Sequence, residues 1–395
     1  MNTSLISTKE AYQKITETIE PLIEHKLRLE QSVSYILAKD VISPINMPPF
    51  RQSAMDGYAI NIHSSKSYKL TGEVKAGDNY HPVLKAGEAV RIFTGAPVPD
   101  TANAVVMQEK VTRLDGQITI DNFTEKGTNI RPSGEQVKQG TIALKKGIKL
   151  TPASVGFLAS LGIVEVFVYK RPSIAIVTTG NELVSIGTDL QYGQIYESNS
   201  VMLSSALQQL GFSNQSLYNV GDNYETTCTL LKNAISKHDV VLITGGISVG
   251  DYDFVGKALK ALDVTEVFYK VKQKPGKPLF FGKKNETAIF ALPGNPAAAL
   301  NCFYIYVHTT LQILSGNTDY TLPKTQKKSL SAFSKKGDRA QFLKAIVKGD
   351  SVTVLDGQSS AMLQSFAIAN GLVFLPADTM RIAIGDVVDV IMLPN

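Results

Sequence analysis

The stretch that decides the fold is VVLITGGISVGDYDF, residues 240–254. Val240–Ile243 are all apolar, which is the pattern of a strand buried in a parallel sheet. The strand ends in Thr244-Gly-Gly246, and ligands of such sheets bind just beyond the carboxyl ends of the strands. Glycines there let the backbone approach an anion, and Asp251 and Asp253 suit a divalent cation that neutralises phosphate. The stretch therefore predicts a phosphate-and-metal site, and the alternative is an ordinary glycine-rich loop.

Outward from this stretch, between Ser173 and about Ser315, apolar strands alternate with helical segments. This alternation predicts a doubly wound parallel α/β sheet with right-handed crossovers. Ser200 is a candidate cap of the first helix, and Pro296 at the start of the last helix leaves N–H groups for an anion. The expected strands are 174–177, 216–220, 240–243, 264–271 and 288–292, and the expected helices are 201–210, 224–236, 254–262 and 297–314.

Four of these strands end in polar loops that contain glycine, at residues 180–182, 221–222, 245–253 and 293–296. In a parallel sheet such ends share one edge, so we expect their side chains to gather there. Independent turns are the alternative for any single loop, but four loops at one edge favour a shared site. The charged residues expected at this edge are Glu182, Asp222, Asp253, Lys274 and Lys277.

Size and composition limit the class of protein. The 395 residues exceed the roughly 250–300 at which single cores usually divide, so we expect two to four domains. With 19% charged and 44% hydrophobic residues the chain is globular, and a net charge of +5 without arginine-rich runs argues against nucleic acid. Cys228 and Cys302 are too few for a disulfide framework or a zinc cluster. No long apolar run or signal peptide is visible, which predicts a cytoplasmic protein with no membrane partner.

The regions on either side of this α/β segment show a different pattern of predicted secondary structure. Ser7 and Glu10 form a capping box at the start of a helix expected over 7–24. From about residue 44 to 140 short β-like runs, broken by Gly-Asp and Gly-Glu, indicate a mostly β insertion. Within it, Asp56 and Thr94 stand next to glycines at strand ends, where plain turn chemistry is the alternative to function. A helix is expected over 151–161 and a strand over 164–169. Beyond Pro323 the strands expected at 329–333, 341–347, 352–354, 371–375 and 387–392 indicate a separate small β domain.

Ten motifs in one order resemble the molybdopterin molybdenumtransferase family, known as MoeA in bacteria and as the E domain of gephyrin in animals. They span nearly the whole chain. The matching motifs are SAMDGYA at 53–59, RIFTGAPVP at 91–99, VVMQE at 105–109, NIRPSGE at 129–135, TTGNEL at 178–183, GQIYESN at 193–199, TGGISVGDYD at 244–253, KPGKP at 274–278, LPGNP at 292–296 and SGNT at 315–318.

The resemblance implies a multidomain α/β protein and an elongated homodimer. The implied domains are a discontinuous helical domain (1–43 and 141–171), a β-rich insertion (44–140), an α/β molybdopterin-binding domain (172–318) and a C-terminal β-barrel (319–395). It also implies an active cleft between the α/β domain of one subunit and the insertion of the other. That arrangement would explain why Asp56 and Thr94 accompany the loops of the α/β domain.

The implied reaction joins adenylylated molybdopterin with molybdate in the presence of Mg²⁺, releases AMP and places molybdenum on the dithiolene. A pyrophosphate is multiply anionic, so its departure needs cations and N–H donors. The resemblance assigns catalysis to Asp56, Glu182, Asp222 and Asp253, of which Glu182, Asp222 and Asp253 would be near the metal; it does not say which one ligates Mg²⁺ and which acts as a base. The implied substrate-binding residues are Thr94, Ser198, Asn199, Gly245, Gly246, Ser248, Gly250, Lys274, Gly276, Lys277, Pro293, Gly294, Asn295 and Pro296.

Several positions depart from the family pattern. Phe254 replaces a tyrosine and so lacks a hydroxyl, and Ser200 replaces an arginine that would be a bidentate anion donor. In the C-terminal domain Lys344 replaces another arginine, and Gln364-Ser365 stands for a common Ser-Ser pair. These changes affect the expected binding of molybdate or terminal phosphate more than the reaction class.

Two alternatives stay open. A molybdopterin adenylyltransferase that uses MgATP shares the α/β domain, but it needs neither the insertion nor the barrel, so the chain length argues against it. A non-catalytic molybdopterin-binding scaffold is the second, because the animal relative also serves as an anchoring protein; no extra interaction domain is visible here and the acidic residues are intact. Candidate partners beyond a second copy are a molybdopterin adenylyltransferase and molybdoenzyme maturation proteins.

Overall fold

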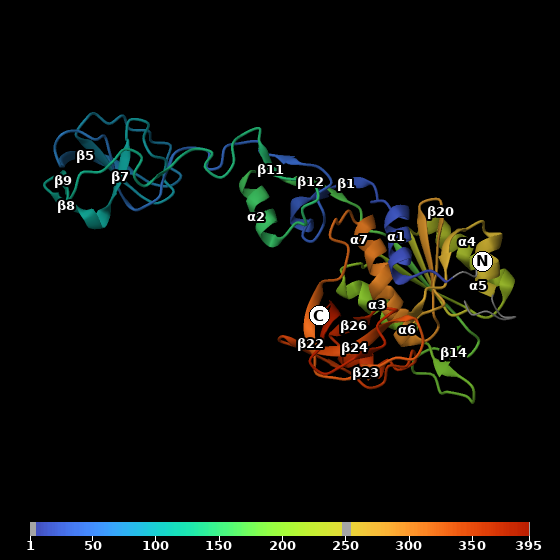
Figure 1. The fold of residues 1–395 in the computed structure, drawn as a ribbon. Helices are drawn as coiled ribbons and strands as arrows, with labels where there is room; N and C mark the ends of the chain where they lie inside the picture. Colours follow the sequence, from blue (N-terminus) through green and yellow to red (C-terminus); the bar gives the residue numbers. More distant parts are fainter. Residues whose placement is uncertain (1–4, 247–253, 395) are drawn as a thin grey trace. The chain divides into compact units, whose positions relative to one another are not determined.

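The computed structural model describes residues 5–246 and 254–394 (Figure 1). The chain forms two compact units. One unit consists of Met1–His25 with Tyr169–Asn395, and the other of Lys26–Val168. No helix in the described part of the chain is long and apolar enough to cross a bilayer.

A six-stranded sheet forms the centre of the first unit, with the order β16-β13-β17-β21-β20-β18. The first four strands in this order are parallel neighbours, which confirms the doubly wound α/β arrangement. Because β16 and β17 lie on opposite sides of β13, the strand order reverses at β13. The bounds are β13 (Ile174–Thr179), β16 (Gln215–Val220), β17 (Val240–Thr244), β18 (Thr265–Tyr269), β20 (Phe280–Lys284) and β21 (Thr287–Leu292).

Strand β20 is the departure from the expected parallel sheet. It runs antiparallel to both β21 and β18, so the sheet is mixed towards one edge. Asn285, with a φ of 50°, and Glu286 form the two-residue turn between β20 and β21. Such a turn joins antiparallel neighbours directly, so no crossover helix is needed there.

Helices cover both faces of this sheet. Ile176 and Leu242 belong to a hydrophobic cluster with α3 and α6, whereas Val177 and Ile243 belong to one with α4 and α5. Alternate residues of one strand therefore belong to two cores, which is why these strands are buried at every position and mostly apolar. The helix bounds are α3 (Asn199–Gln209), α4 (Tyr224–Lys237), α5 (Phe254–Ala261), α6 (Pro296–Cys302), a π-helical turn η3 (Phe303–Val307) and α7 (His308–Leu314).

The capping expectations had mixed outcomes. The box between Ser7 and Glu10 is confirmed at α1 (Thr8–Thr18), with the Glu10 N–H donating to Ser7 Oγ at 3.1 Å. The helix ends earlier than expected, because Ile19 is already extended shortly before Pro21. Ser200 as a cap of α3 is wrong: Ser198 is the N-cap, and the Ser200 N–H in the first turn donates to the Glu197 carboxylate at 2.9 Å.

The C-terminal region forms a closed five-stranded barrel. Its strands follow the order β24-β25-β22-β28-β26, and a pairing of β24 with β26 closes the ring. The strand expected at 329–333 begins earlier, because Lys324–Lys328 pair with β28 and the chain turns after Ser329. The bounds are β22 (Lys324–Ser329), β24 (Ala340–Lys348), β25 (Ser351–Val354), β26 (Gly371–Leu375) and β28 (Val387–Met392), with β23 (Phe333–Ser334), β27 (Arg381–Ile382) and α8 (Gln364–Ile368) outside the ring.

The second unit contains the expected β insertion as a six-stranded sheet with the order β7-β4-β6-β5-β9-β8. Gly57 lies in β4, which pairs with strands on both sides, and an added Cβ would be 2.0 Å from the Val106 carbonyl oxygen, so only glycine fits after Asp56. The bounds are β4 (Gly57–Ile60), β5 (Ser67–Val74), β6 (Glu88–Ile92), β7 (Ala104–Met107), β8 (Val111–Leu114), β9 (Gln117–Ile120), β1 (Glu24–Arg28), β2 (Val41–Ile42), β3 (Gln52–Ser53), β10 (Ile130–Arg131), β11 (Ile142–Leu144), α2 (Pro152–Ser160) and β12 (Glu165–Tyr169).

Candidate functional site

A cavity of about 440 Å³ lies at the carboxyl ends of β13, β17 and β21. Thr179 and Thr244 are the last residues of β13 and β17, between which the strand order reverses, and ligands of doubly wound sheets bind at this place. The cavity is lined by Thr179, Glu182, Leu183, Ile195, Tyr196, Glu197, Ser198, Asn199, Thr244, Gly245, Gly246, Pro278, Pro293, Gly294, Asn295 and Pro296.

Nine of the residues predicted for the site line this cavity together. Three of the four predicted strand-end loops contribute to the lining, through Glu182, through Gly245 and Gly246, and through 293–296, as the shared sheet edge predicts. The fourth contributing segment is the start of α3 instead of the predicted loop 221–222. These nine are Glu182, Ser198, Asn199, Gly245, Gly246, Pro293, Gly294, Asn295 and Pro296. Asp222, Lys274, Gly276 and Lys277 lie in the same unit but do not line it. Ser248, Gly250, Asp251 and Asp253 lie outside the described residues.

The floor of the cavity requires glycine. Gly245 has a φ of 90°, and a Cβ there would be 2.5 Å from the Thr179 carbonyl oxygen. Gly246 has a φ of 62°, and its Cβ would be 2.7 Å from a methyl group of Val255. Larger residues would strain the backbone and collide with Thr179 and Val255, so this turn needs glycines, which cover its main chain with no side chains. Thr244 ends β17 just before this turn, and Thr179 ends the neighbouring strand β13. Neither threonine was assigned to the site from the sequence; their place before glycine at a strand end was the available signal.

Two asparagines shape the opposite wall. Asn199 Nδ2 donates to the Gly294 carbonyl at 2.8 Å, and Asn295 Nδ2 donates to Ser360 Oγ of the barrel region at 2.9 Å. Asn199 Oδ1 is buried and has no hydrogen-bond partner among the described residues. A buried acceptor without a donor is costly, so this atom suits an N–H group of a ligand.

The carboxylates belong to two neighbouring loops. The Asp222 carboxylate accepts from the Asn181 N–H at 3.3 Å, and Asn181 Oδ1 accepts from the Asp222 N–H at 2.9 Å. This reciprocal pair holds the loop of Asp222 against the loop that carries Glu182. Neither carboxylate has an ion-pair partner in the described part of the chain, so both are available to a cation.

The metal prediction rests on these two carboxylates and Asp253. Within residues 5–246 and 254–394 no three His, Cys, Asp or Glu side chains come together to hold a metal. The donors that the structure does describe, Glu182 and Asp222, are hard oxygen ligands of the kind that Mg²⁺ prefers. The residues therefore fit Mg²⁺ by donor type, and the third expected donor lies outside the described residues.

The KPGKP turn is held from below by a buried network. Gln273 Nε2 donates to the Gly276 carbonyl at 3.0 Å, and the Tyr306 hydroxyl donates to Gln273 Oε1. Burial raises the pKa of the neighbouring Cys302 thiol, which therefore stays neutral. Lys274 and Lys277 are exposed on this fixed turn, and the adjacent Pro278 lines the cavity. The turn thus presents two cations beside the cavity.

In the second unit, Asp56 and Thr94 form a separate polar cluster. The Thr94 N–H and hydroxyl both donate to Asp56 Oδ1, at 2.8 and 2.7 Å. These hydrogen bonds, with a smaller effect of the Arg91 charge, lower the pKa of the Asp56 carboxyl. Arg91 lies over the rings of Tyr58 and Phe93. Asp56 is therefore an oriented, exposed carboxylate.

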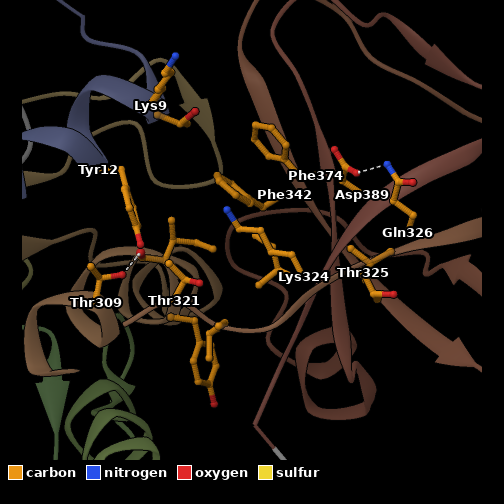
Figure 2. A pocket seen from close by; sticks show the side chains of 16 residues that line it. Lys9, Tyr12, Thr309, Thr321, Lys324, Thr325, Gln326, Phe342, Phe374 and Asp389 are labelled. Carbon is orange, nitrogen blue, oxygen red and sulfur yellow. Dashed lines mark hydrogen bonds between the residues drawn. The ribbon is translucent and has the colours of Figure 1, made fainter. Parts of the chain in front are cut away.

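A larger cavity of about 660 Å³ lies between α1, the η3–α7 helix and the barrel (Figure 2). Tyr12, Phe342 and Phe374 contribute aromatic walls, and its Gln326 and Asp389 are hydrogen-bonded to each other at 3.2 Å. None of the residues predicted for the site lines it. Of the two cavities, the smaller one at the sheet edge is therefore the one that residues predicted for the site line.

The fold and the cavity at the sheet edge define a doubly wound α/β protein with added β domains and a candidate ligand site where the strand order reverses. Three protein-family models match the chain. They are the MoeA N-terminal region (domain I and II) over residues 6–162, the "probable molybdopterin binding domain" over 175–313, and the MoeA C-terminal region (domain IV) over 327–393. This chain belongs to the MoeA family.

Individual relatives agree with this assignment. The molybdopterin molybdenumtransferase of Haemophilus influenzae is 38% identical over 324 residues, which cover 81% of this chain and 80% of the relative. The enzyme of the same name from Staphylococcus aureus strain Mu50 is 32% identical over 400 residues and covers 98% of this chain and 95% of the relative. Among solved structures, the molybdopterin biosynthesis moeA protein of Pyrococcus horikoshii OT3 has a TM-score of 0.85 at 28% identity, covering 99% of this chain and 100% of that one.

Proposed function

We propose that this chain is a transferase of molybdenum cofactor biosynthesis that inserts molybdenum from molybdate into adenylylated molybdopterin and releases AMP. The observation that carries the proposal is the convergence of nine predicted residues on one cavity at the strand-order reversal. The curated relatives that cover most of this chain are named for molybdenum transfer to molybdopterin. The enzyme class follows from these relatives. What we propose beyond it is that the molybdopterin substrate carries an adenylyl group.

The glycine turn and the lysines suit a pyrophosphate-linked substrate. Gly245 and Gly246 leave the main chain open, so the phosphates can approach its N–H groups. Lys274 and Lys277 on the KPGKP turn supply point charges that offset the negative charge of phosphate or molybdate. Cleavage of a pyrophosphate depends mainly on such positioning and charge compensation, which is what these residues provide.

The carboxylates have a separate role. Glu182, Asp222 and Asp253 would hold Mg²⁺, which supplies charge neutralisation at the phosphate oxygens when bound. The Asn181–Asp222 pair already holds the loops of Glu182 and Asp222 against each other in the absence of a ligand. One of these carboxylates would instead accept a proton from the attacking oxygen if it does not ligate the metal.

The asparagine wall suits the organic part of the substrate. Asn199 Oδ1 needs a donor, and a pterin ring carries N–H groups of that kind. Asn199 Nδ2 already donates to the Gly294 carbonyl, so the protein fixes the orientation of this amide. Its Oδ1 is therefore held in one position before a ligand N–H group binds. This preorganisation reduces the entropy cost of binding.

We further propose a cytoplasmic homodimer in which Asp56 and Thr94 of one subunit complete the site of the other. The support is chemical: Asp56 is exposed and oriented by Thr94, yet it serves no ion pair within the described residues. A molybdopterin adenylyltransferase would supply the substrate, and molybdoenzyme maturation proteins would receive the product.

The test uses purified protein with adenylylated molybdopterin, molybdate and Mg²⁺, and measures AMP release and molybdenum incorporation. Molybdate-dependent AMP release with metal transfer is the expected result. Consumption of ATP on free molybdopterin would instead identify an adenylyltransferase. Tight binding without AMP release would identify a scaffold and reject the enzymatic proposal.

A further inference from the structure

We propose that Lys344 is a positioning residue of the cavity: its ammonium group holds the barrel loop 357–362 so that Ser360 stays on Asn295. The catalytic consequence of this inference rests on the function proposed above. The structural consequence does not, and it is measured separately below.

The Lys344 ammonium is enclosed by carbonyl oxygens. It lies in β24 and is only 3% exposed. Its Nζ donates to the carbonyl oxygens of Gly357 at 2.7 Å, Met362 at 3.0 Å and Ser359 at 3.2 Å. An ammonium has three N–H donors, so all of them are used within this loop. Lys344 therefore has no N–H left for an anionic ligand, although its position in the family pattern is one where an arginine is common.

The same strand position also anchors the loop through its backbone. The Lys344 N–H donates to Gln358 Oε1 at 3.0 Å, and Gln358 Nε2 donates back to the Lys344 carbonyl at 2.9 Å. Gln358 Nε2 also reaches the Leu355 carbonyl at 2.8 Å. The loop is thus attached to β24 at one residue by both side-chain and main-chain hydrogen bonds.

The far side of the loop meets the cavity. Ser360 Oγ accepts from Asn295 Nδ2 at 2.9 Å, and the Ser360 carbonyl accepts from the Ala298 N–H at 3.2 Å. Asn295 lines the cavity next to Gly294, to which Asn199 is bound from the other side. Ser360 therefore holds the loop 293–296 through Asn295. Its carbonyl also accepts from the Ala298 N–H in the first turn of α6, so this N–H is not available to an anion.

The geometry distinguishes lysine from arginine at this position. Three carbonyl oxygens converge on one nitrogen, which suits the compact ammonium of lysine. The planar guanidinium of arginine spreads its donors over a larger fork and is longer, so it would not satisfy the same three oxygens. A direct role in anion binding would give the opposite preference, because arginine binds oxyanions through two hydrogen bonds.

The experiment compares Lys344→Met, Lys344→Arg and Ser360→Ala in the full-length protein, with Lys335→Met as the matched control. Lys335 is also buried in the barrel region, and its ammonium also donates to three carbonyl oxygens, those of Arg339, Pro376 and Ala377. None of these residues lines the cavity. A general loss of barrel stability would therefore affect Lys335→Met and Lys344→Met alike.

Hydrogen exchange gives the structural readout. In both Lys344 variants, the backbone N–H groups of 357–363 and 294–299 should exchange at least about tenfold faster, because the hydrogen bonds that hold these two segments are lost. Ser360→Ala should accelerate exchange only in 294–299, and Lys335→Met should leave 294–299 unchanged. Unchanged exchange of 294–299 in Lys344→Met, in protein that remains folded, would overturn the inference, and so would an equal increase in Lys335→Met.

Steady-state kinetics gives the catalytic readout. We expect kcat/KM for AMP release to fall about three- to tenfold in Lys344→Met and in Ser360→Ala, the effect of one hydrogen bond. The double variant should be no worse than Lys344→Met, because both changes break one chain of contacts. Multiplicative effects would show that Lys344 and Ser360 act independently, and full activity in Lys344→Arg would assign Lys344 to direct anion binding; either result rejects the positioning role. If the unaltered protein releases no AMP, the proposed function fails while the exchange data still test the loop.

Discussion

Replacing Gly276 by alanine should destabilise the protein and displace the lysines beside the cavity. Gly276 has a φ of 85°, and an added Cβ would be 2.4 Å from Cys302 Sγ and 3.1 Å from Gln273 Nε2. Both neighbours are fully buried, so neither side chain can move out of the way into solvent. The substitution therefore combines a strained backbone with an overpacked core.

The expected cost follows from these two contributions. A left-handed backbone costs about 1–2 kcal/mol for a residue with a Cβ. Overpacking of a tight core adds about 1–3 kcal/mol. We expect the free energy of unfolding of the first unit to fall by about 3 kcal/mol, measured by urea denaturation. The kcat/KM for AMP release should fall as well, because Lys274 and Lys277 flank the displaced residue.

Two controls separate the contributions. Gly337 has a φ of 84°, but an added Cβ would have nothing within 4 Å, so Gly337→Ala should cost only the backbone part. In a Cys302→Ala background the steric part of Gly276→Ala should shrink, giving a favourable coupling of about 1–2 kcal/mol. A wild-type urea midpoint for Gly276→Ala, or a cost that Cys302→Ala leaves unchanged, would refute the reasoning.

Three further outcomes are expected. Glu182→Gln and Asp222→Asn should each lower kcat for AMP release at least about a hundredfold and weaken the response to Mg²⁺, while the exposed Glu225→Gln should be neutral; normal Mg²⁺ titrations would remove both carboxylates from the metal site. Burial lowers the pKa of His308 to about 4, so its contribution to folding stability is fully present above pH 6.5. Up to about 3 kcal/mol of this stability is lost as the pH falls from 6.5 to 4. The urea midpoint of His308→Gln should lack this part of the pH dependence, and identical profiles for the two proteins would contradict it. Gly57→Ala should unfold the β4 sheet, detected by circular dichroism, because of the 2.0 Å approach to the Val106 carbonyl oxygen; a native spectrum and melting temperature would contradict this.

The sequence predicted the α/β core well because its strands are buried on both faces. Val240–Thr244 and Ile174–Thr179 are apolar or small at every position, and this pattern has few alternatives once glycine loops follow. The antiparallel strand β20 was missed, since Phe280–Lys284 is short, contains glycine and two lysines, and follows a proline-rich turn. Its position depends on pairing with β21, which local periodicity does not reveal.

For the site, the motifs named nine residues that line one cavity, but hydrogen bonds between distant loops could not be predicted from the sequence. Ser360 and Asn295 are 65 residues apart, and nothing local indicates that they share a hydrogen bond. Lys344 stood out only as a departure from an arginine pattern, and the three carbonyl oxygens around its ammonium became visible only in three dimensions. Thr179 was overlooked because the sequence indicates only that it ends a strand, whereas the structure shows that it lines the cavity.

The closed barrel has a consequence for biosynthesis on the ribosome. Strand β28 pairs with both β22 and β26, so the ring cannot form until β28 has left the exit tunnel. Until then β22 and β26 present unpaired backbone edges together with the apolar side chains of Leu372 and Val373. Nascent chains that stall before β28 has emerged should therefore associate with chaperones or aggregate, whereas emergence of this one six-residue strand removes both exposed edges at once.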